Sequence, residues 1–167
     1  MKRYSLTLFF LTVITLCSNS AWSQSKAAAG FEKLKALVGE WQGPGSDGKL
    51  RTATYQLLSD GTAVMETLTP ADEPSMATVY YVDGDRLLMT HFCSAGNQPR
   101  MRAEAAAGEI QKLDFDFLDA TNLAKPTAGH IHRLQITFQD QDHIAQTWTW
   151  REEGKEMLNT FKLERKK

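Results

Sequence analysis

The stretch ATVYYVDGDRLLMTHF, residues 77–92, contains the pattern that decides the fold. Residues 77–82 are rich in Val, Thr and Tyr and alternate at a period of two, which is typical of a strand with one buried face. The VDGD segment at 82–85 has the composition of a short hairpin turn. The stretch therefore predicts two antiparallel strands joined by a tight connection.

The same combination of strand and turn recurs along most of the chain. Turn signals such as GPGSDG, LSDGT and SAGNQP return about every ten residues, and the runs between them alternate, as in RTATYQL, KLDFDF, HRLQITF and AQTWTW. This pattern predicts an all-β fold of about nine strands. Because the connections are short, neighbouring strands pair in an antiparallel meander. A meander of this length removes its exposed edges by closing into a barrel.

One short helix precedes the strands. In the segment GFEKLKALVGEW, Phe31, Leu34, Leu37 and Val38 lie at helical spacing. The spacing predicts an amphipathic helix over residues 30–38, and Gly39 supplies the stop signal.

The ends and the composition indicate an exported protein of one domain. MKRYS is a positively charged start, LTLFFLTVITLC is a short apolar core, and AWS offers a cleavage site before Gln24. Residues 1–23 are therefore expected to be a signal peptide, and residues 24–167 a single domain in the periplasm or outside the cell, with no membrane anchor. Cleavage would remove Cys17 and leave Cys93 with no partner for an internal disulfide. The net charge of −1 gives no basic field for nucleic acid.

Three segments carry a family resemblance. LVGEWQGPG, which follows the predicted helix, resembles the opening of calycin-type barrels, in which the Trp of a Gly-x-Trp motif packs across the base. Gly39, Trp41, Gly43 and Gly45 match the longer Gly-x-Trp-x-Gly-x-Gly form, which is similar to nitrobindin-like haem-binding barrels. VYYVDGDRLLMTHFCSAGNQPRM and DQDHIAQTWTWREEGKE resemble a group of exported bacterial proteins of lipocalin-like type. The resemblance implies a calycin-like barrel with one open end and Trp41 as a packing residue.

The sequence departs from these families in two respects. Nitrobindin-like proteins hold haem through a His near the C-terminus, but the last predicted strand, EMLNTFKLERKK, contains no His. Lipocalins often carry disulfides, and this chain cannot form one. The resemblance therefore implies the barrel fold, but the histidine that would bind a haem cofactor is missing from the last predicted strand.

Strand alternation predicts which polar side chains face the barrel interior. His130 and His132 share parity with Leu134, Ile136 and Phe138, so we expect both imidazoles to point inward. By the same rule His91 shares a face with Leu87 and Met89. Further polar or amphipathic candidates for an interior patch are Glu66, between Val64 and Leu68, and Trp148, between Ile144 and Trp150.

The turn after residue 93 offers a second set of polar groups. Asn97, Gln98 and Arg100 lie at a strand end, where two amides and a guanidinium suit a carboxylate or another polar head group. The alternative is structural: the amides bond the backbone of their own turn, and Arg100 belongs to the solvated face of a strand.

Two catalytic alternatives use the same residues. His130 and His132, with His91 as a third ligand, could hold a divalent metal with an open position, as catalytic zinc sites do. The structural alternative is a pair of histidines bonded to backbone and neighbours. Cys93 lies two residues from His91 on one strand, too far for a direct nucleophile–base contact, and a buried thiol is the simpler interpretation.

Taken together, the sequence predicts an exported barrel that binds a small, partly apolar ligand. Its expected binding residues are Glu66, His91, Asn97, Gln98, Arg100, His130, His132 and Trp148. A metal-assisted enzyme using His91, His130 and His132 is the first alternative, and an envelope protein whose barrel is filled by side chains is the second. No cofactor is firmly implied, with haem or a divalent metal as the alternatives.

Overall fold

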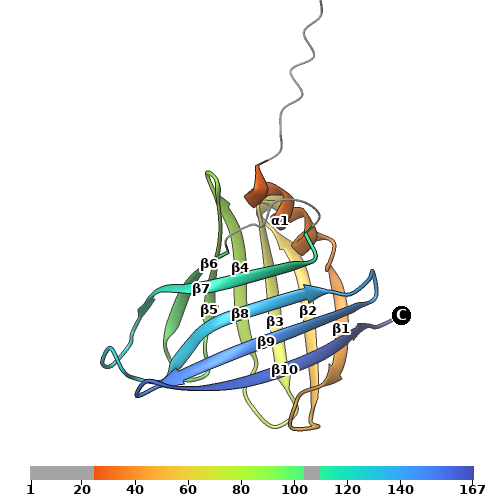
Figure 1. Cartoon of the computed structure of the whole chain (residues 1–167). Coiled ribbons are helices and arrows are strands. Elements are labelled where there is room, and N and C mark those ends of the chain that lie inside the picture. Colours follow the sequence, from red (N-terminus) through yellow and green to blue (C-terminus); the bar gives the residue numbers. More distant parts are fainter. Residues whose placement is uncertain (1–24, 104–109) are drawn as a thin grey trace, which may run out of the picture.

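Strands β1 to β10 close into one antiparallel barrel in the computed structural model, which describes residues 25–103 and 110–167 (Figure 1). The ten strands of this described part are β1 Gly39–Pro44, β2 Leu50–Leu58, β3 Ala63–Pro70, β4 Met76–Asp83, β5 Arg86–Phe92, β6 Gln98–Ala103, β7 Lys112–Thr121, β8 His130–Phe138, β9 His143–Glu152 and β10 Lys155–Arg165. Each strand pairs with its neighbours in sequence, and β1 closes the ring against β10. The predicted all-β meander is confirmed, with ten strands where the alternation suggested about nine.

Helix α1, Lys26–Lys35, lies across one end of the barrel (Figure 1). It begins four residues before the predicted start, because the Ser25 hydroxyl accepts a hydrogen bond from the Ala28 amide and caps the first turn. Phe31 and Leu34 are buried, and the helix packs against β4 and β5. This end of the barrel is therefore closed.

Trp41 fixes the junction between the helix and the barrel. Its side chain is fully buried, and its indole Nε1 donates to the Leu37 carbonyl at 2.7 Å. The Arg165 guanidinium lies over the ring, 4.3 Å from its centroid. The expected packing role of Trp41 at the closed end is confirmed.

Gly43 in the same motif is explained by the closure of the barrel. A Cβ at this position would lie 1.8 Å from the carbonyl oxygen of Lys162 on β10. Only a glycine lets β1 approach β10 this closely. The second glycine of the Gly-x-Trp-x-Gly pattern is thus required by the β1–β10 seam.

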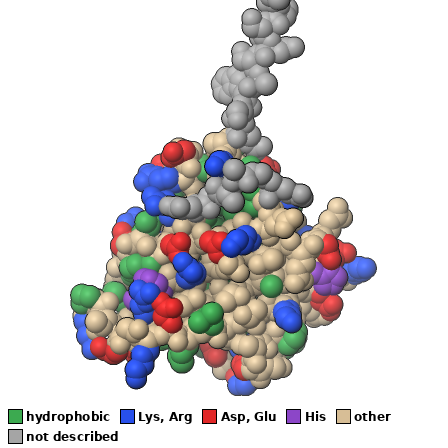
Figure 2. Space-filling view, viewed as in Figure 1, with side chains coloured by type: hydrophobic (Ala, Val, Ile, Leu, Met, Phe, Trp, Pro, Cys, Tyr) green, Lys and Arg blue, Asp and Glu red, His purple; other side chains and the backbone are tan. Residues whose placement is uncertain are grey.

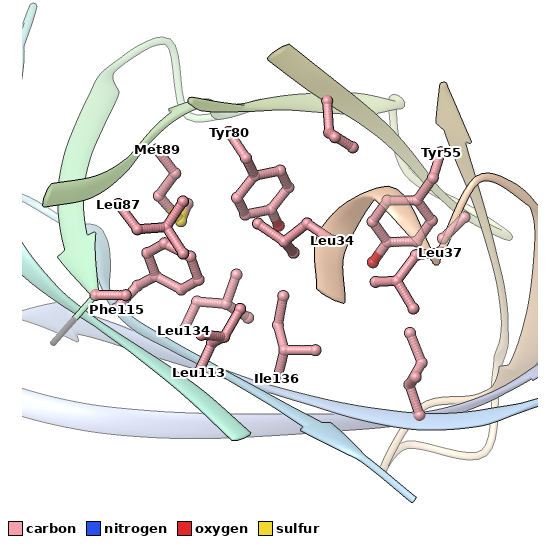
Figure 3. Close-up of a cluster of buried hydrophobic side chains, with 14 of the residues drawn as sticks. Leu34, Leu37, Tyr55, Tyr80, Leu87, Met89, Leu113, Phe115, Leu134 and Ile136 are labelled. Carbon is pink, nitrogen blue, oxygen red and sulfur yellow. The ribbon is translucent and has the colours of Figure 1, made fainter. Parts of the chain in front are cut away.

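Apolar side chains fill the barrel at the helix end. Tyr55, Tyr80 and Met89 contribute to this cluster from β2, β4 and β5 (Figure 3). Leu34 and Leu37 close it from the helix side. The remaining labelled members are Leu87, Leu113, Phe115, Leu134 and Ile136. One half of the barrel is therefore a packed core.

On the outer face, charged side chains pair across neighbouring strands. Figure 2 shows basic and acidic groups side by side, and the ion pairs include Arg133 with Asp116 at 2.7 Å and Lys112 with Asp114 at 2.9 Å. Exposed ion pairs of this kind contribute little to the stability of the fold.

Strand β8 breaks the alternation that the sequence suggested. Leu134 lies opposite Trp148 and Ile131 opposite Trp150, with a β-bulge between Ile131 and Arg133. A bulge inserts one extra residue into the strand and so reverses the parity of the positions before it. The prediction that both His130 and His132 point into the barrel with Leu134 is therefore wrong, and Ile131 takes the inward position.

The expected signal peptide, residues 1–23, lies outside the described residues. Within residues 25–103 and 110–167, no helix has the length and apolar character needed to cross a membrane.

Candidate functional site

A cavity of about 430 Å³ occupies the end of the barrel opposite α1. Its volume lies within the range of small-molecule pockets, about 300–1,000 Å³. The apolar wall comes from Leu68, Ile131, Trp148, Trp150, Met157 and Phe161. Met157 and its neighbour Leu158, which also lines the cavity, are the most exposed large apolar side chains of the described chain. The barrel is hence packed at one end and hollow at the other.

His91 is a buried polar group on the cavity wall. Its Nδ1 lies 2.9 Å from the Thr78 hydroxyl, and its ring packs against Trp148 with centroids 4.8 Å apart. Its Nε2 is buried and has no hydrogen-bond partner among the described residues. Burial lowers the pKa of His91 to about 4, so the imidazole is neutral at pH 7.

Arg51 is a second buried polar group on the wall, which the sequence analysis missed. Its Nη2 donates to Asp47 at 2.8 Å, Nη1 donates to the Leu50 carbonyl at 3.3 Å, and the guanidinium lies over Phe161. Its Nε is buried and has no partner in the described chain. The alternation in RTATYQL, which gives Arg51 the parity of the buried Tyr55, was the available signal.

A hydrogen-bonded network lies across the interior around Glu66, which alternation correctly placed inside. Tyr80 donates to one Glu66 oxygen at 2.6 Å, and Gln146 Nε2 donates to the other at 2.6 Å and to the Tyr55 oxygen at 2.5 Å. Trp148 Nε1 donates to Gln146 Oε1 at 3.0 Å. Burial raises the pKa of Glu66. Glu66 itself does not line the cavity. It accepts hydrogen bonds from Tyr80 and Gln146 beneath the cavity wall.

His130 and His132 form a pair on the other side of the barrel wall. The His130 Nδ1 lies 2.7 Å from the Ala128 carbonyl, so Nδ1 carries the proton, and its Nε2 accepts from His132 Nδ1 at 3.2 Å. Both rings pack against Phe117. His132 lines a groove on the outer face with Arg151, and partial burial, with the charge of Arg151 as a smaller cause, lowers the pKa of His132. His130 and His132 thus bond the backbone and each other, as the structural alternative predicted. The pair does not lie beside His91.

The side-chain amides of the turn residues Asn97 and Gln98 donate hydrogen bonds to backbone carbonyls. Asn97 Nδ2 donates to the Gly129 carbonyl at 2.9 Å, and Gln98 Nε2 donates to the Gly96 carbonyl at 3.2 Å. Arg100 projects from the outer face, where its guanidinium pairs with Asp119. Of the eight residues expected to bind ligand, the cavity lining contains His91 and Trp148.

The described residues offer little support for the catalytic and cofactor alternatives. Among residues 25–103 and 110–167, no three His, Cys, Asp or Glu side chains are grouped to hold a metal ion. Burial raises the pKa of Cys93, so the thiol form is favoured on the cavity wall. The last strand, β10, contains no histidine, so the ligand that the nitrobindin-like resemblance would supply for haem is missing.

Comparisons with known proteins support the fold. No family model and no curated protein matches the chain. Among solved structures, Rv2717c from M. tuberculosis is 17% identical, with a TM-score of 0.58 over 82% of this chain and 97% of that one. A DUF3598 protein of unknown function from Nostoc punctiforme is 14% identical, with a TM-score of 0.46; the chain spans about half of its length, 49%. The chain is thus a closed antiparallel barrel, and it shares this fold with Rv2717c.

Proposed function

We propose that this protein binds a small, partly apolar molecule in the cavity at the open end of its barrel. The observation that carries the proposal is the pair of unpartnered buried polar atoms, Arg51 Nε and His91 Nε2, on an otherwise mainly apolar wall. Leaving such an atom unpaired costs about 1–3 kcal/mol. A ligand in the cavity would bury its apolar part against Trp148 and Phe161, and a small displacement of the wall would let it bond these atoms and recover the cost.

The hollow half of the barrel supports this function over the alternatives. An envelope protein held together only by its core has no need of a cavity of about 430 Å³ lined by two tryptophans. A metal-assisted enzyme needs a third ligand near the histidine pair, and His91 lies on the cavity wall, whereas His132 lines the outer groove. The binding function needs only groups that line one cavity, among them His91, Arg51 and Trp148.

Binding is tested with N-phenylnaphthylamine, an uncharged apolar dye that fluoresces in apolar surroundings. We expect saturable binding by the wild-type protein and slower reaction of Cys93 with N-ethylmaleimide when the dye is bound, because Cys93 lines the same cavity. Arg51→Met is expected to change the binding of polar competitors. Arg100→Met is the matched control, since Arg100 lies outside the cavity. Absence of saturable binding and of Cys93 protection by any small molecule would refute the function.

Export is part of the same proposal. Residues 1–23 have the charge, apolar core and small residues of a signal peptide, and residues 24–167 would then act as one domain in the periplasm or outside the cell. N-terminal sequencing of the exported protein should give Gln24. A lipid-modified Cys17 at the N-terminus would contradict both the start site and the unanchored state.

A further inference from the structure

Glu73 carries an unpaired charge at the rim of the cavity. In the described part of the chain, the charged side chains among the lining residues are Arg51 and Glu73. Arg51 is buried and pairs with Asp47 at 2.8 Å. Glu73 is exposed and has no ion-pair partner among residues 25–103 and 110–167. The positive charge of the wall is therefore compensated, whereas the negative charge is not.

The surrounding groups do not cancel the charge of Glu73. Its neighbour in the turn between β3 and β4, Asp72, pairs at 3.0 Å with Lys49 from the turn between β1 and β2. Lys49 and Arg51 are thus each matched by an aspartate. His91 adds no positive charge at pH 7, because burial lowers its pKa to about 4.

The field of Glu73 reaches the wall of the cavity. Cys93 lines the cavity from the turn between β5 and β6, and its pKa is raised by burial and, as a smaller cause, by the negative charge of Glu73. Apolar walls focus such a field into a cleft. A cationic group that enters the mouth is therefore attracted, and an anionic group is repelled.

The aromatic side chains give the wall the same preference. Trp148, Trp150 and Phe161 line the cavity. The face of an aromatic ring carries negative potential and so favours a cation over an anion. The Arg51 guanidinium, 5.3 Å from the centroid of the Phe161 ring, is already such a contact. Both the aromatic rings and Glu73 thus select for positive charge.

We propose that the ligand of this cavity is an organic amine whose ammonium group lies beside Glu73 at the rim and whose apolar body packs against Trp148 and Phe161. The ammonium group keeps contact with water there, because Glu73 is exposed, and so avoids the cost of burying a charge. This inference rests on the proposed function, because it names the chemical class of the molecule that the same cavity binds.

The test compares three molecules of one shape: hydrocinnamylamine, hydrocinnamyl alcohol and hydrocinnamate. Each competes with N-phenylnaphthylamine at pH 7. Slower reaction of Cys93 with N-ethylmaleimide, relative to the same protein without ligand, checks that the site is the cavity. The amine is expected to bind more tightly than the alcohol, and about tenfold or more tightly than the carboxylate.

Substitutions at the rim assign the preference to Glu73. Glu73→Gln should bring the affinities of the amine and the carboxylate within about threefold of each other and leave the alcohol unchanged. Glu73→Lys should reverse the order, so that the carboxylate binds more tightly than the amine. Glu32→Gln is the matched control, because it removes an exposed carboxylate from α1 at the other end of the barrel and should keep the wild-type order.

Salt provides a second measurement on the wild-type protein. At about 1 M sodium chloride the Debye length falls to about 3 Å, so the ratio of the amine and carboxylate affinities should move toward one. An apolar contact common to both molecules would leave this ratio unchanged.

The outcomes separate the inference from the function beneath it. Binding of the alcohol or the carboxylate as tightly as the amine, or a preference for the amine that survives Glu73→Gln or Glu73→Lys, overturns the inference and leaves the binding function standing. If neither the dye nor any of the three molecules binds or protects Cys93, the binding function fails as well.

Discussion

Lowering the pH should destabilise the folded protein through His91. In the folded state the pKa of His91 is lowered from 6.5 to about 4, because the ring is buried against Trp148. Between these values the unfolded chain binds a proton that the folded chain does not, so stability falls as the pH falls. At about 1.36 kcal/mol for each pH unit of this window, the loss is about 3 kcal/mol between pH 6.5 and pH 4.

Glu66 acts in the opposite direction, so the effect of His91 must be isolated. Burial raises the pKa of Glu66 above 4.5, and the folded chain therefore takes up a proton there before the unfolded chain does as the pH falls. This contribution stabilises the fold as the pH falls through the folded-state pKa. It is shared by any variant that leaves Glu66 in place, and so it cancels in a comparison of wild type with His91→Phe.

Urea unfolding of both proteins from pH 7 to pH 4 measures the difference. The stability of the wild type relative to His91→Phe should decrease by about 3 kcal/mol across this range. His143→Phe, which removes an exposed imidazole beside Asp140, controls for the loss of a histidine from the chain. If the difference between wild type and His91→Phe stays constant within about 1 kcal/mol, His91 is not held neutral by burial.

Three further changes test the fold and the assignment of the cavity. Trp41→Ala should cost about 3–5 kcal/mol in urea unfolding, the usual loss for a large aromatic side chain in a core, and a loss below about 1 kcal/mol would contradict its packing role. Gly43→Ala should cost about 3 kcal/mol or more, because its Cβ would meet the Lys162 carbonyl, and an unchanged melting temperature would show that the seam is looser than described. Arg100→Ala should cost at most about 1 kcal/mol, since its pair with Asp119 is exposed, and a large loss of ligand affinity would return Arg100 to the site.

The architecture was predictable from the sequence because a period of two is a local property. Each alternating run specifies its own strand, and short turns leave few choices of pairing. The interior positions of Glu66, His91 and Trp148 followed correctly from this rule, and all three are buried. The strand count was short by one, because the alternation gives strand ends only approximately.

The cavity was less predictable because parity fails where a strand is irregular. The bulge after Ile131 depends on how β8 pairs with β9, which no single strand encodes, and it took His130 and His132 off the inner face. Arg51 shows the converse error. Its parity indicated an inward side chain. That Asp47, four residues before it, and Phe161, on the last strand, would surround a buried guanidinium depends on tertiary contacts that no local pattern shows.

The network beneath the cavity leads to a last prediction, on Glu66→Gln. The Trp148 indole can only donate, so it fixes the Gln146 oxygen toward itself and leaves the Gln146 amide nitrogen pointing at residue 66 and at Tyr55. A glutamine at position 66 must then turn its oxygen toward Gln146. Its amide nitrogen faces Tyr80, which has to accept where it formerly donated.

The proton of the Tyr80 hydroxyl then loses the acceptor that Glu66 supplies in the wild type. A buried donor without a partner costs about 1–3 kcal/mol, so Glu66→Gln should lower the free energy of unfolding by this amount. Urea unfolding at pH 7 measures the loss. Glu73→Gln at the cavity rim removes a carboxylate outside the network and should change the stability by less than about 0.5 kcal/mol. If Glu66→Gln unfolds at the same urea concentration as the wild type, Tyr80 keeps an acceptor without the carboxylate, and Glu66 does not fix the direction of these hydrogen bonds.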